Sequence, residues 1–193
     1  MYRLETERLL LTRVSEDHEA EIHRLHRDPL IVGALFDGKQ LSVAENRERL
    51  ALYLEDWRRH GFGFFIVQER RPGGGGGQVI GRSGFRYLGQ ARPVEFGHCF
   101  TAKASGRGIA SEAGRAVIRF GMTVLGISQL VGFVRQENHR GLSTLLKLGF
   151  RHVDDRPHHG RKMKYFALTS EEVLRREASN KVEGSRLNQL EKA

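Results

Sequence analysis

The chain has 193 residues, of which 39% are hydrophobic, so it is long enough for one domain with a substantial core and too short for two ordinary domains. Its 32 basic and 23 acidic residues give a formal charge of +9, which attracts phosphates and nucleic acid alike, but the basic residues lack the interleaved aromatic residues of a base-stacking platform. No apolar run approaches the roughly 18 residues of a membrane span, and the single cysteine excludes an internal disulfide, so we expect a cytoplasmic protein without a membrane anchor.

The beginning of the chain predicts a strand followed by a helix. Residues 7–14 mix apolar and polar positions over a strand-length run, and Ser15 offers a cap for the helix that comes next. Ile22 and Leu25 lie on one face of that helix. Pro29 is expected to end it, because proline disfavours helical geometry in the residue before it.

A second helix and three strands follow. Ser42 opens a capping-box pattern, so a helix is expected from there to about Gly61. Phe62–Gln68 and Gln78–Leu88 predict two strands joined by a run of five glycines, and Pro93–Thr101 predicts a third. The glycine run is not followed by the Lys-Ser/Thr pair of a phosphate-binding loop, so we interpret it as a solvated hairpin tip.

The second half of the chain continues the alternation of helices and strands. Apolar residues recur at three- and four-residue spacing from Ala113 to Val124 and predict an amphipathic helix. The elements expected after it are the strand Gln129–Val134, a helix from Asn138 to Gly149, the strands Phe150–Val153 and Met163–Leu168, and a final helix. This order indicates an α/β (α+β) fold in which one mixed sheet carries flanking helices. Residues 177–193 are expected to form a polar extension, either helical or disordered.

A glycine-bearing turn before the helix at 113–124 is the most informative segment. Gly106 and Gly108 remove side chains where backbone amides approach a ligand, and the helix that follows presents free N–H groups at the positive end of its dipole. Arg107 and Ser111 add one charged and one neutral donor. This geometry suits a pyrophosphate, although such turns also occur simply to pack a helix against a sheet.

The order and spacing of four motifs resemble the GNAT superfamily of N-acetyltransferases, and within it the ribosomal-protein-alanine N-acetyltransferase-like group. The resemblance spans about residues 4–172. The motifs are Glu5-Thr6-Glu7-Arg8-Leu9-Leu10-Leu11, Glu95-Phe96-Gly97-His98, Ser105-Gly106-Arg107-Gly108-Ile109-Ala110-Ser111-Glu112-Ala113, and Asn138 followed by Lys147-Leu148-Gly149-Phe150.

The resemblance implies an acyltransferase domain over residues 1–176 that binds acetyl-CoA or another acyl-CoA. Its sheet is expected to have about six to seven strands and to splay between Val94–Thr101 and Gln129–Val134, so that the pantetheine arm takes the place of a strand. Asn138 matches an asparagine that contacts pantetheine, while capping of the next helix is its alternative role. The cofactor-binding residues implied are Cys99, Phe100, Thr101, Ser105, Gly106, Arg107, Gly108, Ile109, Ala110, Ser111 and Asn138.

Catalytic residues are less firmly indicated, because direct attack of an amine on a thioester needs little more than deprotonation. Glu95 and His98 are the candidates for the amine proton, with an ion pair and a packed histidine as their alternatives. Gly141 stands where the group has a serine that assists the leaving thiolate, so Tyr165, His98 or water is expected to take that part. Ser105 replaces a bulky aromatic residue.

The function expected is transfer of an acetyl or other small acyl group from CoA to an amine. The acceptor is a protein N-terminus, a lysine or a small amine, and the sequence does not choose among them or between a monomer and a homodimer. We assign no metal site, no membrane partner and no primary nucleic-acid partner. Two alternatives remain: a non-catalytic acyl-CoA-binding regulatory module, suggested by Gly141, and a basic nucleic-acid-associated protein, suggested by the net charge.

Overall fold

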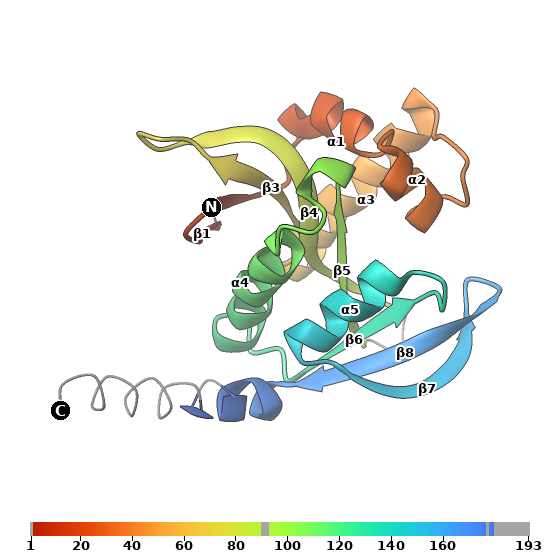
Figure 1. Ribbon diagram of the computed structural model, residues 1–193. Helices are drawn as coiled ribbons and strands as arrows, with labels where there is room; N and C mark the ends of the chain where they lie inside the picture. The colour runs from red at the N-terminus through yellow and green to blue at the C-terminus, as the bar shows by residue number, and fades with distance from the viewer. Residues whose placement is uncertain (1, 90–92, 177, 180–193) are drawn as a thin grey trace.

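The computed structural model describes residues 2–89, 93–176 and 178–179 (Figure 1). Its strands are β1 (Arg3–Glu5), β2 (Leu9–Arg13), β3 (Phe64–Arg70), β4 (Gly76–Tyr87), β5 (Val94–Phe100), β6 (Gln129–Val134), β7 (Arg151–His158) and β8 (Arg161–Thr169). Its helices are η1 (Glu16–His18), α1 (Glu19–Leu25), α2 (Pro29–Leu35), α3 (Val43–His60), η2 (Ala102–Ala104), α4 (Ile109–Thr123) and α5 (His139–Leu148), and residues 170–176 are also helical.

The eight strands form one sheet in the order β1-β2-β3-β4-β5-β6-β8-β7. This confirms the mixed α/β class, with one strand more than the six to seven expected. The additional strand is β1, which pairs with β2 from Arg3 opposite Thr12 to Glu5 opposite Leu10. Its three residues are too few to show the alternation that identifies a strand in sequence.

The sheet splays in its middle, as the sequence analysis predicted. β5 and β6 are parallel, and their register joins Val94 with Leu130 and Glu95 with Val131. Both strands then continue, β5 to Phe100 and β6 to Val134, while β5 stays paired with β4 along its length. The backbone of β5 beyond Glu95 therefore faces a gap on its β6 side.

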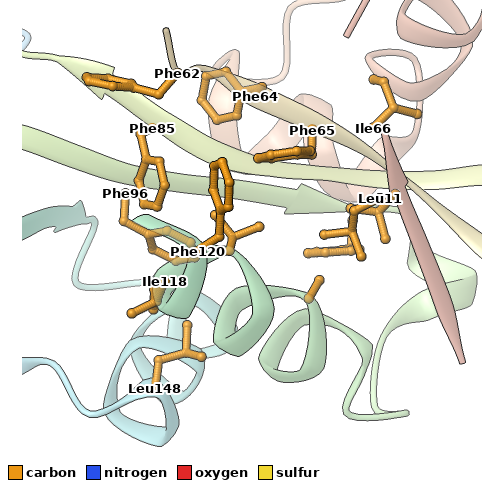
Figure 2. Close-up of a cluster of buried hydrophobic side chains, with 14 of the residues drawn as sticks. Leu11, Phe62, Phe64, Phe65, Ile66, Phe85, Phe96, Ile118, Phe120 and Leu148 are labelled. Carbon is orange, nitrogen blue, oxygen red and sulfur yellow. The ribbon is translucent and has the colours of Figure 1, made fainter. Parts of the chain in front are cut away.

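Helices cover both faces of the sheet. α4 packs on one face, where Gly114 admits Leu148 and Phe96 so closely that an added Cβ would lie 2.7 Å from a Leu148 methyl group. α1 and α3 cover the other face, and Trp57 of α3 donates to the carbonyl of Phe64 at 2.9 Å. Figure 2 shows the aromatic side chains that fill the core beside α4, among them Phe85, which is fully buried.

Pro29 both follows one helix and begins another, so the expectation that it only stops a helix was incomplete. α1 ends at Leu25, and Asp28 caps α2 by accepting from the N–H of Leu30 at 3.0 Å. Proline fits the first helical position because its missing N–H has no partner there. The result is a short helix, α2, beside the end of β5.

The expected strands Phe150–Val153 and Met163–Leu168 extend further toward each other than predicted and form a β-hairpin. β7 and β8 pair as far as His158 opposite Arg161, and His159 and Gly160 make the turn with φ angles of 48° and 72°. Charged residues on a solvated hairpin hide the alternation that marks a half-buried strand. The expected extension at 177–193 lies outside the described residues except for 178–179.

Within the part of the chain that the structure describes, no helix is long and apolar enough to cross a membrane.

Candidate active site

A cavity of about 720 Å³ lies at the open side of β5. It is bounded by α2, the last residues of β5, the turn before α4 and the first turns of α5. Its walls include every predicted cofactor-binding residue except Arg107: Cys99, Phe100, Thr101, Ser105, Gly106, Gly108, Ile109, Ala110, Ser111 and Asn138. The structure thus brings together residues separated by about 40 positions in sequence.

The turn before α4 presents backbone donors to this cavity. Gly106 and Gly108 have φ angles of 78° and 74°, which residues with a side chain rarely adopt. The helical hydrogen bonds of α4 begin with the bond from the N–H of Glu112 to the carbonyl of Gly108. The N–H groups of Ile109 to Ser111 come before this bond and have no partner within the helix. Such a helix start is an anion-binding arrangement.

The start of the chain braces this turn, a contact that the sequence analysis did not anticipate. Glu112 accepts from the Thr6 hydroxyl, from the Arg8 backbone N–H at 3.1 Å and from the Arg8 guanidinium at 2.7 Å. Arg8 also donates to the carbonyl of Arg107 at 3.0 Å. Partial burial opposes ionisation of Glu112, but the bonds from Thr6 and Arg8 prevail and lower its pKa.

Arg107 lies in the turn without lining the cavity. Its guanidinium pairs with Glu69 of β3 at 2.7 Å. A surface ion pair of this kind is weak and exchanges readily. Its expected role as a phosphate donor therefore stays a prediction.

Asn138 has the capping role considered for it and also lies in the cavity wall, while its contact with pantetheine stays a prediction. Its side-chain oxygen accepts from the N–H of Gly141 at 2.9 Å and so caps α5, and the residue also lines the cavity. A Cβ at Gly141 would lie 2.7 Å from the Asn138 amide nitrogen and 3.1 Å from a Val134 methyl group. Glycine at 141 therefore leaves room for Asn138 in this position.

His98 and Glu95 lie on opposite faces of β5, because side chains alternate along a strand. His98 lines the cavity, half-buried between Phe96 and Phe100. Burial and then the nearby Arg82 lower the pKa of His98 to about 4, so the imidazole is neutral at neutral pH. Glu95 is buried and bonded to the guanidinium of Arg86 on β4.

Cys99 and Tyr165 complete the set of predicted residues. Burial raises the pKa of the Cys99 thiol, which is therefore a packed, protonated group of the cavity wall. Tyr165 lies on β8 outside the lining, between Phe133 at 5.1 Å and the guanidinium of Arg156 at 3.6 Å from its ring. Tyr165 does not line the cavity that His98 lines, so its part in the chemistry stays a prediction.

Polar residues of α5 line the cavity although the sequence analysis did not select them. They are Arg140, Ser143, Thr144 and Lys147. Ser143 lines the same cavity as Gly141. To predict these polar residues, one would have to know which face α5 turns toward the cavity and α4, and only tertiary packing determines this.

A second cavity of about 800 Å³ adjoins the first. The two share Leu30, Ala34, Asn138, His139 and Arg140. It extends from α2 to the turn between β7 and β8, where Arg161 and Lys162 form its far wall. The first cavity therefore lies beside the glycine turn, and the second lies beside the β7–β8 hairpin.

Comparison with known proteins matches residues 8–151 to the family model described as an acetyltransferase (GNAT) domain. This match covers the glycine turn, β5, β6 and α5, and it includes the whole of the first cavity.

Solved structures share the fold at low sequence identity. An acetyltransferase from Agrobacterium tumefaciens is 19% identical with a TM-score of 0.75, covering 87% of this chain and 94% of its own. The ribosomal-protein-S5-alanine acetyltransferase from Vibrio fischeri is 13% identical with a TM-score of 0.71, covering 88% and 97%. The aminoglycoside acetyltransferase AAC(6')-Ib in complex with coenzyme A is 14% identical with a TM-score of 0.72, covering 86% and 98%.

Proposed function

Because the chain belongs to the acetyltransferase (GNAT) family, we propose that it transfers an acetyl or other small acyl group from acyl-CoA to an amine. The observation that carries the proposal is the first cavity, in which free amides at the start of α4 and the unpaired side of β5 face the same space. A pyrophosphate matches the free amides of α4, and the amides of pantetheine match the unpaired backbone of β5.

The cofactor is proposed to lie along the gap between β5 and β6. The N–H groups from Gly106 to Ser111 would hold its pyrophosphate, and the backbone of Cys99 to Thr101 would pair with the pantetheine arm. Asn138 keeps an amide N–H₂ for the same arm while its oxygen caps α5. The thioester is proposed to lie near His98, in the wall of the first cavity.

The proposed chemistry is direct transfer. The amine nitrogen forms a bond to the thioester carbonyl carbon, the C–S bond breaks, and CoA leaves as the thiolate. The neutral imidazole of His98 has a lone pair for the amine proton, directly or through water. Glu95 is proposed to act only through Arg86 and the position of β5, since it faces the other side of the strand.

A non-catalytic acyl-CoA-binding module is the second candidate, favoured by the absence of a side chain at Gly141. It predicts that acetyl-CoA binds as tightly as CoA and that no amine is acetylated. Detection of free thiol released in the presence of an amine panel, beyond hydrolysis without amine, decides between the two.

Calorimetric titration with acetyl-CoA and CoA tests the cofactor site. We expect Gly108→Val to weaken binding at least tenfold, because valine at a φ of 74° is strained and distorts the turn that presents the amides. Gly126→Val is the matched control: Gly126 has a φ of 68°, an added Cβ there meets open space, and it lies outside the cavity. Equal binding by both variants, or none by the wild type, would refute the proposal.

A further inference from the structure

The second cavity is lined by an excess of positive charge. Arg135 from the end of β6, Arg140 from α5, and Arg161 and Lys162 from β8 contribute four cations, and Glu137 contributes one carboxylate. His139 is a further titratable group of the wall. Such an excess within one hollow attracts anions and repels cations more strongly than charges scattered over a convex surface.

Asp37 reduces this excess only in part. It lies just beyond α2 and pairs with both Arg135 and Arg161, the latter at 2.9 Å, so it fixes two of the guanidinium groups. Among the residues that the structure describes, neither Arg140 nor Lys162 makes an ion pair, although Lys162 is near enough to Asp155 to contribute to the lowered pKa of that carboxyl. These two cations come from different elements and are available to a ligand.

The position of the cavity connects this charge to the acceptor. It adjoins the first cavity, with which it shares the lining residues Asn138, His139 and Arg140, and the thioester is proposed to lie in that first cavity. An amine that attacks the thioester from this side has the rest of its molecule among the cations.

Resting on the proposed function, we propose that the acceptor is an amine flanked by carboxylates, as at the N-terminus of an acidic polypeptide. Cations spread over β6, α5 and β8 match several carboxylates along an extended chain better than one compact anion, and arginine binds carboxylates in bidentate fashion. A polycationic amine would meet like charge at the same walls, which opposes its binding.

Three peptides that share an N-terminal alanine test this inference, with glutamates, glutamines or lysines at the next three positions and a fluorophore at the C-terminus. Anisotropy is measured with the full chain saturated with CoA. We expect the acidic peptide to bind at least tenfold more tightly than the basic one at low ionic strength, and added salt to reduce the difference. Lys162→Gln should weaken binding of the acidic peptide by about three- to tenfold, and Lys162→Glu by more.

Arg115→Gln is the matched control, because Arg115 is exposed on α4 and lines neither cavity. Equal or reversed affinities across the three peptides overturn the inference, as does equal weakening by Arg115→Gln and Lys162→Gln. It is also overturned if Lys162→Gln weakens CoA binding as much as peptide binding, since the cations would then serve the cofactor. If the acidic peptide binds but is not acetylated when acetyl-CoA replaces CoA, only the proposed function is contradicted.

Discussion

His98 shows how the environment of one residue defines its chemistry. The imidazole lines the first cavity, and burial and Arg82 lower its pKa to about 4, so it is neutral at neutral pH. If His98 is the proposed base, it accepts a proton only transiently, during the transition state, and passes it on to water. The neutral form also avoids repelling an acceptor amine that arrives protonated.

A pH titration of the imidazole by NMR checks this state directly. We expect the His98 resonances to move with a midpoint near 4, whereas an exposed histidine titrates near its usual range. If His98 receives the amine proton, His98→Gln should lower kcat about 100-fold and leave CoA affinity unchanged. A midpoint above 6, or an equal loss of CoA binding, would contradict this role.

Substitutions at Gly141 separate the steric effect of an added Cβ from the chemical effect of an added hydroxyl. Any Cβ at this position crowds the Asn138 amide, so Gly141→Ala and Gly141→Ser should both displace Asn138 and lower the free energy of unfolding by about 1 kcal/mol through loss of the α5 cap. Urea denaturation measures this. If a hydroxyl here assists departure of the thiolate, the kcat of Gly141→Ser should be higher than that of Gly141→Ala.

At the scale of elements, contacts between distant segments make the site. The start of the chain reaches across to α4, where Thr6 and Arg8 hold Glu112 and the carbonyl of Arg107. The glycine turn is therefore held from outside the cavity by residues that do not line it.

A double-mutant cycle on Arg8→Ala and Glu112→Ala measures this brace. We expect a coupling free energy of about 0.5–1.5 kcal/mol, limited because Arg8 is partly exposed. Each single variant should also weaken CoA binding. Because the pKa of Glu112 is lowered in the folded state, the coupling should be complete at neutral pH and disappear as the carboxylate is protonated in acid. Additive effects would show that the turn is held independently of the brace.

The sequence predicts elements best where local signals are strong. Ser42 and Glu45 form the expected capping box of α3, and Gly61 and Gly149 end α3 and α5 in left-handed conformations. The glycine turn could be predicted because glycine is the residue that favours positive φ and lacks a side chain, and glycines are visible in the sequence. Three other features have no such local signal: the hydrogen bonds to Glu112, the face that α5 turns to the cavity, and the cationic second cavity. Each arises from segments that approach one another only in the folded chain.

At the scale of the whole molecule, buried histidines link stability to pH. Burial, followed by Arg82, lowers the pKa of His26 to about 3, and its Nδ1 bonds to the side-chain oxygen of Asn46 at 2.7 Å. His98 is lowered similarly. The unfolded chain therefore binds protons at a higher pH than the folded one, and the folded state loses stability as the pH falls below about 6.5.

Denaturant unfolding from pH 7.5 to 4.5 tests this expectation. Each histidine should steepen the loss of stability by up to about 1.4 kcal/mol per pH unit. His98→Gln should flatten the curve relative to the wild type, because it removes one of the two buried groups whose pKa is lowered. Parallel curves for the two proteins would mean that other groups control acid sensitivity.

The short pairing of β5 with β6 also makes the protein divisible. Their register joins residues 94 and 95 with 130 and 131, while the strands from β1 to β5 and from β6 to β8 are each continuously antiparallel. A chain cut between α4 and β6 would yield two fragments, each retaining most of its own sheet. A ligand seated across the junction would contact both fragments, so we expect acetyl-CoA to promote their reassembly and to turn the divided protein into a sensor of its own cofactor.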